Sequence, residues 1–440
     1  MALGGGTFVT QNKVLPGSYI NFVSAARASA TLSDRGVVAM PLVLDWGIDN
    51  EVFTVTSGDF QKNSLEIFGY AYTEDAISDL RELFRNARLG YFFKVNGTGG
   101  VKATSTYGTA KYKGAGGNKI KLVITQNEDE TTFDFELFFG TKAAWQQTGV
   151  AARSELQDNN FVAWTKTGTI TLSAGISFTG GVTGTTSGDD YQTFIDKIEG
   201  YTFNTVGIAT TDQTVNGLAA TWTKRMRDEM GLKFQTVLYR YSGADYEGII
   251  SVENKLEGET GDDTDSGGMV FWVTGAEAGC DVNKSITNKV YDGEYHPDVD
   301  YTQIQLEQAI KAGKFIFHRV NADVRVLTDI NTLVNLTADK GDVFQSNQTI
   351  RVIDQIANDI AVLFNSKYLG VVPNDEGGRI SLWADIVKHH EQLQDIRAIE
   401  NFADTDVEVT QGNTKRSVVV ADAVTVVNAM EQLYMTVTVS

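Results

Sequence analysis

The residues best suited to metal binding and nucleophilic chemistry are scarce, because the chain has only four histidines and one cysteine. His389, His390 and Glu391 are consecutive, but no second histidine follows at the spacing of the HExxH zinc motif. We therefore expect both histidines on a solvated helix surface. Cys280 stands among small residues without a base nearby in the sequence, so we expect a buried, unreactive thiol.

The sequence does not match the motifs that bind phosphate or calcium or that carry out acyl transfer. Gly313 and Lys314 lack the preceding glycine and the following hydroxyl residue of a P-loop. The acidic stretch 257–265 does not keep the oxygen ligands of an EF-hand, and we expect a mobile acidic loop there. The chain also has no GxSxG nucleophile elbow. No catalytic, cofactor-binding or metal-binding residue is predicted, and the protein is not expected to be an enzyme.

The charge balance argues against nucleic acid as a partner. The 440 residues include 37 basic and 56 acidic side chains, a formal net charge of −19, which repels a phosphate backbone. A single cysteine cannot form an intrachain disulfide and fits assembly in a reducing cytoplasm. No run approaches the roughly 18 apolar residues that span a bilayer, and residues 1–10 lack signal-peptide features. We expect a soluble chain that does not insert into membranes.

Two groups of basic residues stand at spacings that largely share one helix face. They are Arg81, Arg85 and Arg88, and Lys224, Arg225 and Arg227. In an acidic chain such groups form either ordinary solvated faces or faces that dock onto an acidic neighbouring copy, and the sequence leaves both interpretations open.

The expected fold is a multidomain chain of α/β and α+β character. Four prolines beside 43 glycines leave most backbone N–H groups free for sheet ladders. Strands alternate with helices on both sides of a glycine-rich, helix-poor region, which predicts an inserted all-β sandwich. The predicted divisions are an N-terminal arm (1–30), an α/β unit (31–96), the sandwich (97–185), a central α/β domain (186–345) and a C-terminal α/β domain with a terminal strand (346–440).

Hydrophobic periodicity predicts the individual elements. The predicted helices are 76–88, 191–199, 213–230, 268–280, 303–312, 349–365 and 380–396. The predicted strands are 36–44, 91–95, 108–113, 119–126, 132–139, 205–209, 234–239 and 248–252, with a hairpin of 314–320 and 324–327. Residues 179–190 are predicted to be a linker.

Both ends of the chain have the pattern of strands. The candidate N-terminal strand residues are Tyr19, Ile20, Asn21, Phe22 and Val23, and the candidate C-terminal ones are Leu433, Tyr434, Met435, Thr436, Val437, Thr438 and Val439. These strands either complete the chain's own sheets or pair with an exposed sheet edge of a neighbouring copy. Five ladder bonds at about 1 kcal/mol net each would stabilise such a link by about 5 kcal/mol.

Short segments along nearly the whole chain resemble, in their order, the contractile tail sheath proteins of bacteriophages and related particles. They are 4–8, 14–22, 114–118, 279–285, 291–293, 329–333, 351–354, 368–370 and 422–439. Each segment alone is weak evidence for the resemblance, but their ordered succession along the chain is strong evidence. The chain is shorter than the largest members, so it should lack their additional outer domains.

The resemblance implies a structural protein without cofactors, whose copies form a helical polymer of stacked rings, expected to be hexameric, around a tail tube. Its α/β core, built from N- and C-terminal parts, would face the tube, with the sandwich at larger radius. Contraction, triggered by the baseplate, would drive the tube through the target cell envelope. Candidate tube-facing residues are His389, His390, Glu391, Gln394 and Arg397.

The other implied partners are the tail tube protein, the baseplate and the tail terminator proteins. The implied location is a virion tail or an extracellular phage-tail-like particle, assembled in the cytoplasm of the bacterial host. Two alternatives stay open: the sheath of an R-type bacteriocin or other contractile injection particle, and a carbohydrate-binding module or enzyme that uses the β domain.

Overall fold

The computed structural model describes residues 32–241, 243–257 and 267–439. These residues form two compact units. Of the described residues, the larger unit contains 34–357 and 426–439, with the gaps given above, and the smaller unit contains 32–33 and 358–425. The predicted mixture of α/β layers with an all-β sandwich is confirmed.

A seven-stranded sheet forms the centre of the larger unit. All neighbouring strands in it run parallel except β2, which pairs antiparallel with β3. The strand order is β14 (Lys314–Phe315), β13 (Ile249–Val252), β12 (Gln235–Tyr239), β11 (Thr205–Ile208), β1 (Val37–Leu42), β3 (Leu89–Lys94) and β2 (Val52–Thr56).

Helices cover both faces of this sheet, which explains why its strands are apolar on both sides. On β1, Val38, Met40 and Leu42 belong to one core cluster, whereas Ala39 belongs to the other. The first cluster includes residues of α1 (Ser57–Phe68), α2 (Ser78–Phe84) and α5 (Met269–Gly279). The second includes residues of α3 (Gly188–Ile198) and α4 (Gln213–Asp228).

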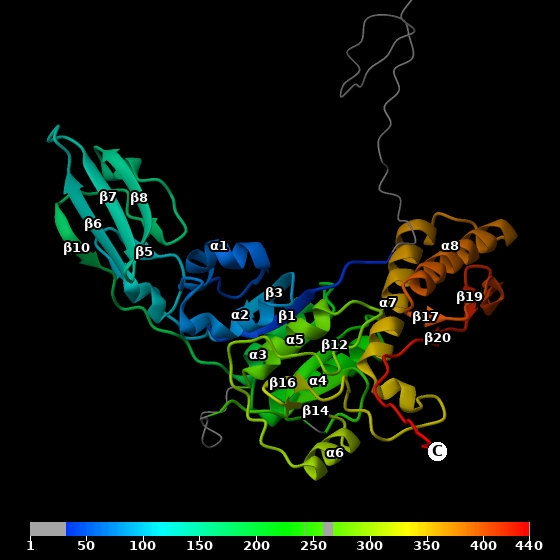
Figure 1. Cartoon of the computed structure of the whole chain (residues 1–440). Coiled ribbons are helices and arrows are strands. Elements are labelled where there is room, and N and C mark those ends of the chain that lie inside the picture. Colours follow the sequence, from blue (N-terminus) through cyan, green and yellow to red (C-terminus); the bar gives the residue numbers. More distant parts are fainter. Residues whose placement is uncertain (1–31, 242, 258–266, 440) are drawn as a thin grey trace, which may run out of the picture. The chain divides into compact units, whose positions relative to one another are not determined.

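The inserted sandwich has its own core and two antiparallel sheets. One sheet contains β10 (Ser173–Ser177), β6 (Ile120–Gln126), β7 (Phe133–Phe139) and β8 (Lys142–Val150), and the other contains β4 (Thr104–Ser105), β5 (Gly108–Ala110) and β9 (Val162–Trp164). Figure 1 shows the four longer strands lying together. The segments that enter and leave the sandwich pair with each other through bridges between Val101 and Val182 and between Thr104 and Thr179.

The remaining elements of the larger unit are α6 (Gln303–Lys311) and a hairpin of β15 (Phe317–Val320) and β16 (Asp323–Val326). Helix α7 (Asn347–Leu363) begins in the larger unit and ends in the smaller one. The smaller unit continues with a π-helical turn (Phe364–Tyr368), α8 (Glu376–Asp395), β17 (Ile399–Glu400), β18 (Val407–Gln411) and β19 (Val418–Asp422), and β20 (Thr425–Val426) follows.

Most predicted helices and strands are present, with shifted ends. Helix α8 begins four residues before the predicted start at Ile380 and includes Gly377 and Gly378, because Asp375 caps it by accepting a hydrogen bond from the Gly378 N–H. The predicted strand 314–320 is divided, since 314–315 join the main sheet. Residues 188–190 of the predicted linker belong to α3.

Close packing of α5 against α2 depends on a glycine. A Cβ at Gly275 would lie 2.2 Å from the backbone oxygen of Leu83, whereas a Cβ at Gly188 would meet no atom within 4 Å. We predict that Gly275→Ala lowers the free energy of unfolding by about 1–3 kcal/mol through overpacking. Urea denaturation measures the change, with Gly188→Ala as the matched control. Equal stability of the two variants would contradict the packing argument.

Candidate functional site

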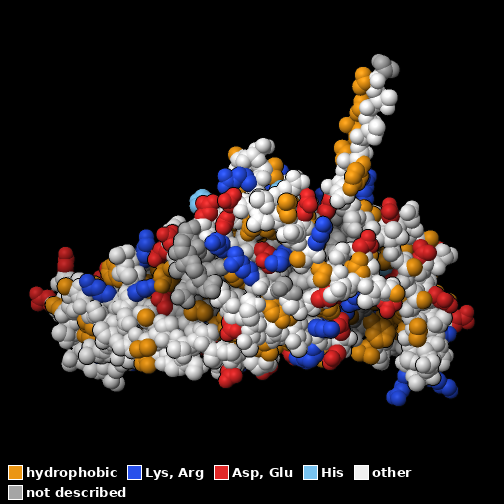
Figure 2. All heavy atoms as spheres, turned by 90° about the horizontal axis from the view of Figure 1, so that it is seen from below, with side chains coloured by type: hydrophobic (Ala, Val, Ile, Leu, Met, Phe, Trp, Pro, Cys, Tyr) orange, Lys and Arg blue, Asp and Glu red, His pale blue; other side chains and the backbone are white. Residues whose placement is uncertain are grey.

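The C-terminal arm, residues 433–439, is exposed and pairs with nothing in the described chain. Leu433 is 85% exposed, Val437 69% and Val439 90%. None of the described residues 427–439 belongs to a strand. Figure 2 shows the arm projecting from the surface with its apolar side chains along one edge. The C-terminal strand pattern therefore completes no sheet within the part of the chain that the structure describes.

The segment immediately before the arm, residues 427–431, is held firmly and is called the arm root. The Gln348 side chain donates to the Val427 carbonyl at 3.1 Å and accepts from the Ala429 N–H at 2.9 Å. The Glu431 carboxylate accepts hydrogen bonds from the hydroxyls of Thr287 at 2.7 Å and Thr328 at 3.0 Å. The arm thus leaves the larger unit from a fixed point.

A buried charge cluster holds the part of α7 that binds the arm root. The fully buried Arg351 guanidinium forms ion pairs with Glu277 of α5 and, at 3.2 Å, with Asp329. It also donates to the Lys284 carbonyl. The cluster therefore joins α5, α7 and two loops that are far apart in the sequence.

The two carboxylates of this cluster differ in their proton affinity. Burial raises the pKa of Glu277 well above its ordinary value, and the nearby Asp329 adds to the effect. Burial also acts to raise the pKa of Asp329, but the Arg351 charge and hydrogen bonds to the carboxylate lower it below its ordinary value. Glu277 is therefore the carboxyl that binds a proton more readily.

Several segments of the sequence pattern meet at this cluster. Arg351, Asp329 and Lys284 belong to three of the segments singled out in the sequence, and Arg351 contacts both of the others directly. Cys280, from the same segment as Lys284, lies close by and is half-buried, so the expectation of a fully buried thiol is wrong. Burial raises the pKa of this thiol to about 11.

In the smaller unit, His389 and His390 are buried, so the expected solvated helix surface is wrong for both. The Nε2 atom of His389 lies 3.0 Å from the Asp359 carboxylate, and that of His390 lies 2.9 Å from the Asp422 carboxylate. The sequence could not show this, because Asp359 and Asp422 come from α7 and β19. Among the other candidate tube-facing residues, Glu391 and Arg397 are exposed and Gln394 is half-buried.

A two-stranded antiparallel sheet in the smaller unit pairs with no further strand among the described residues, and the Val407 carbonyl on its outer edge accepts a hydrogen bond from the Trp383 indole N–H at 3.0 Å. It consists of β18 and β19, paired from Val407–Asp422 to Gln411–Val418. A groove of about 490 Å³ between α8 and β18 is lined by all five residues of β18, 407–411, with Ile380 and Trp383 of α8 among its other residues. Since consecutive strand residues line it, the groove follows the backbone edge of β18, where an added strand could bind.

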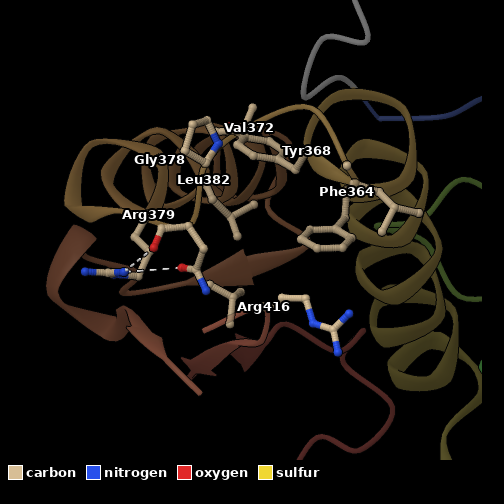
Figure 3. A pocket seen from close by; sticks show the side chains of 12 residues that line it. Phe364, Tyr368, Val372, Gly378, Arg379, Leu382 and Arg416 are labelled. Carbon is tan, nitrogen blue, oxygen red and sulfur yellow. Dashed lines mark hydrogen bonds between the residues drawn. The ribbon is translucent and has the colours of Figure 1, made fainter. Parts of the chain in front are cut away.

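A smaller apolar pocket of about 110 Å³ adjoins the hairpin. Figure 3 shows Phe364, Tyr368 and Leu382 around it, with Arg379 and Arg416 on the hairpin side. Arg379 also lines the groove along β18 and donates to the Asn374 carbonyl at 3.2 Å. The pocket can hold an aliphatic side chain, but it brings together no set of groups suited to catalysis.

The two groups of basic residues on α2 and α4 do not form continuous exposed faces, because each group has a buried member. Arg81 is buried and binds the Glu294 carboxylate through two nitrogen atoms. Arg227 is buried and forms a two-point ion pair with Asp354 of α7. The partners lie 213 and 127 residues away, which is why helix spacing alone suggested exposed stripes.

Some predictions concern residues outside the described part of the chain. They are the N-terminal strand residues 19–23 and most of the acidic loop 257–265. Within the described part, no group of three or more histidine, cysteine, aspartate or glutamate side chains could hold a metal ion. None of the described helices combines the length and apolar character needed to cross a membrane.

Four family models match successive parts of the chain, and all describe a phage tail sheath protein. They are the Gp18 domain III N-terminal region (residues 35–89), the beta-sandwich domain (98–185), the central domain (184–332) and the C-terminal domain (339–440). The phage-like element PBSX protein XkdK of Bacillus subtilis is 30% identical over 474 residues, which cover 100% of both chains.

Solved structures agree with these matches. The crystal structure of a sheath tail protein from Desulfitobacterium hafniense has a TM-score of 0.77 and 35% identity, covering 90% of this chain and 93% of that one. The helical sheath of the anti-feeding prophage, solved in its contracted state, has a TM-score of 0.56 and 12% identity, covering 97% and 99%. At that identity the second likeness shows the fold alone.

Removing the central guanidinium should strongly destabilise the larger unit. Arg351→Met would leave Glu277 and Asp329 buried without their shared cation, which we expect to lower the free energy of unfolding by about 3–5 kcal/mol. Urea denaturation measures this loss. Arg225→Met, at a partly exposed ion pair with Glu199, is the matched control, for which a change below about 1 kcal/mol is expected. A loss of stability no larger than that of the control would show that the cluster is dispensable.

Proposed function

The chain belongs to the phage tail sheath protein family, and from this premise we propose that its copies polymerise as a helical sleeve around a tail tube. In this proposal the sleeve contracts when triggered at the baseplate and drives the tube through the envelope of a target cell. The protein acts as a structural subunit without catalysis or a cofactor.

The exposed C-terminal arm carries the proposal. Leu433, Met435, Val437 and Val439 place four large apolar side chains in water, with no partner for their backbone among the described residues. A neighbouring copy offers what this segment lacks, because the outer edge of β18 can extend its ladder and α8 supplies the apolar groove wall. We propose that the arm of one copy binds along β18 of another.

Such a link suits a polymer that changes its lattice. The arm root stays bonded to Gln348, Thr287 and Thr328, while the arm itself makes few contacts with its own chain. Copies connected in this way can rotate relative to one another while their larger interfaces exchange. The extended sleeve would be kinetically trapped, and contraction would release free energy through better-packed interfaces. The N-terminal strand, residues 19–23, is proposed to form a second link of the same kind.

The remaining partners are the tube, baseplate and terminator proteins of the same particle, and the stacked rings are proposed to be hexameric. Of the candidate tube-facing residues, Glu391 and Arg397 have the exposure that contact with a tube requires. The proposed location is a virion tail or a phage-tail-like particle, assembled in the bacterial cytoplasm.

The second possibility is that the protein forms the sheath of a contractile particle without a capsid, such as a bacteriocin or an injection particle. The likeness to the anti-feeding prophage sheath and the relationship to a phage-like element of Bacillus subtilis support it. The subunit would work in the same way in both contexts. Neighbouring capsid and terminase genes would favour a phage.

Deleting residues 433–440 is predicted to abolish polymerisation while leaving the monomer folded, because the arm contributes nothing to the described cores. Negative-stain microscopy of concentrated protein measures sleeve formation, and circular dichroism checks the fold. A matched control replaces only the polar positions Thr436 and Thr438 by serine, which keeps the apolar edge and should still give sleeves. Normal sleeves from the truncated chain would refute the role of the arm.

A further inference from the structure

A pocket of about 410 Å³ lies beside the arm root, at the place where the C-terminal arm leaves the larger unit. Its apolar lining includes Ile310 of α6 and Ile330, and its acidic lining includes Asp342 and Glu431. None of the residues that line it is a lysine or an arginine. The pocket, called the root pocket below, therefore combines apolar surface with negative charge.

The carboxylates of the root pocket lack a cation at its mouth. Among the described residues, Asp342 forms no ion pair. The hydrogen bonds that Glu431 accepts there come from two threonine hydroxyls. Deeper in the pocket, one oxygen of the buried Asp329 pairs with Arg351, whereas its Oδ1 atom has no hydrogen-bond partner in the described part of the chain. A positively charged donor would therefore find groups that the chain itself leaves unpaired.

The turn between β18 and β19, residues 413–416, carries the opposite charge and is called the basic turn. Lys415 and Arg416 are exposed, and neither side chain forms an ion pair among the described residues. The backbone that carries them is held, because the Asn374 side chain donates to the carbonyls of Lys415 at 3.2 Å and Ser417 at 2.8 Å. The basic turn thus presents two cations from a fixed position.

The two ends of β18 differ in charge. The basic turn follows the strand, whereas the short helical turn Asp404–Asp406 precedes it and contributes two carboxylates. The Trp383 indole also occupies the outer edge at the preceding end, through its bond to the Val407 carbonyl. A neighbouring arm that enters from the basic end brings its acidic root against opposite charge, whereas one that enters from the acidic end brings it against like charge.

We propose that the basic turn of one copy binds the root pocket of the neighbouring copy whose arm it receives. This inference rests on the proposed function, since the arm must lie along β18 of another copy. The arm then runs antiparallel to β18, because only this direction places Leu433, at the start of the arm, next to Gln411, at the end of the strand.

The reach of the chain allows this contact. Glu431 lies two positions before Leu433, which is about 7 Å of extended chain. The hydrogen bond from the Gly412 N–H to the Ser417 carbonyl, at 2.8 Å, closes the hairpin, so Lys415 also lies about two residue lengths beyond the end of the ladder. In the antiparallel arrangement both charges therefore project beyond the same end of the bound strand.

Such a contact gives the arm a direction. Backbone ladders form with parallel and with antiparallel strands, so a ladder alone discriminates weakly between the two. Opposite charges at one end and like charges at the other favour the antiparallel arrangement and disfavour the reverse. The basic turn and the root pocket would thus act as a polarity signal between copies.

Cysteine cross-linking of assembled sleeves tests the position of the two surfaces. In a Cys280→Ala background, Val343→Cys lies beside Asp342, and Asn413→Cys lies in the basic turn, so every charge of the proposed contact is kept. We expect oxidation to link copies into a ladder on a non-reducing gel. Val343→Cys with Thr405→Cys, at the acidic end of β18, is the matched control and should give no ladder.

Three results of this experiment would overturn the proposal. They are the absence of a ladder from the first pair, a ladder from the control pair, and a link confined to single chains. The last result would mean that the basic turn meets the root pocket of its own copy.

Charge reversal tests the attraction itself. At low salt, Lys415→Glu should raise the lowest protein concentration that gives sleeves about tenfold, and Asp342→Lys should do the same. The two substitutions together restore opposite charges and should return this concentration to within about twofold of the unchanged chain. Lys62→Glu, at an exposed site of α1, changes the net charge equally and should have no effect. Additive losses in the double variant, or an equal loss from Lys62→Glu, would contradict the proposal.

The proposed function and this inference fail in different ways. If the unchanged chain forms no sleeves, the polymer proposal fails and the contact fails with it. If sleeves form and depend on residues 433–440 but the charge variants assemble like the unchanged chain, only the contact is wrong. Sleeves that need the arm, and that either reversal weakens but the double reversal restores, would support both.

Discussion

A single buried guanidinium holds together the parts of the larger unit on which the arm depends. Arg351 is fully buried, and a charge removed from water at this cost is tolerated only where partners surround it. Glu277, Asp329 and the Lys284 carbonyl supply them, so α5, α7 and two loops have one permitted arrangement. Gln348, one helical turn before Arg351, is thereby placed to hold the arm root.

In the larger unit, the arm root is held in place by hydrogen bonds, whereas the arm that follows it is unpaired among the described residues. Hydrogen bonds from both sides fix Val427 to Glu431, and a few residues later the chain exposes alternating apolar side chains. In the smaller unit, the hairpin of β18 and β19 forms a sheet of only two strands within the described residues. The proposed function joins these two features between copies, since a polymer of identical subunits needs both partners of each contact on every copy.

Local patterns predicted those features that depend on neighbouring residues. Periodicity located α4 and α5 to within two residues at each end, whereas the alternation after Leu433 forms no strand among the described residues. Helix α1 and strand β2 were missed, although Thr56 and Gly69 mark the two ends of α1 as a cap and a left-handed residue. Burial of Arg81, Arg227 and the histidine pair could not be predicted, because each depends on a carboxylate brought near only by the fold.

The paired entry and exit segments of the sandwich also have a consequence for how such a protein can be altered. Bridges at Val101–Val182 and Thr104–Thr179 bring the two connections of this domain together at one stalk. Exchanging everything beyond that stalk for an unrelated module with closely spaced termini would leave the seven-stranded sheet with its original connections. The stalk is therefore a natural splice point, at which the sandwich can be exchanged without altering the connections of the main sheet.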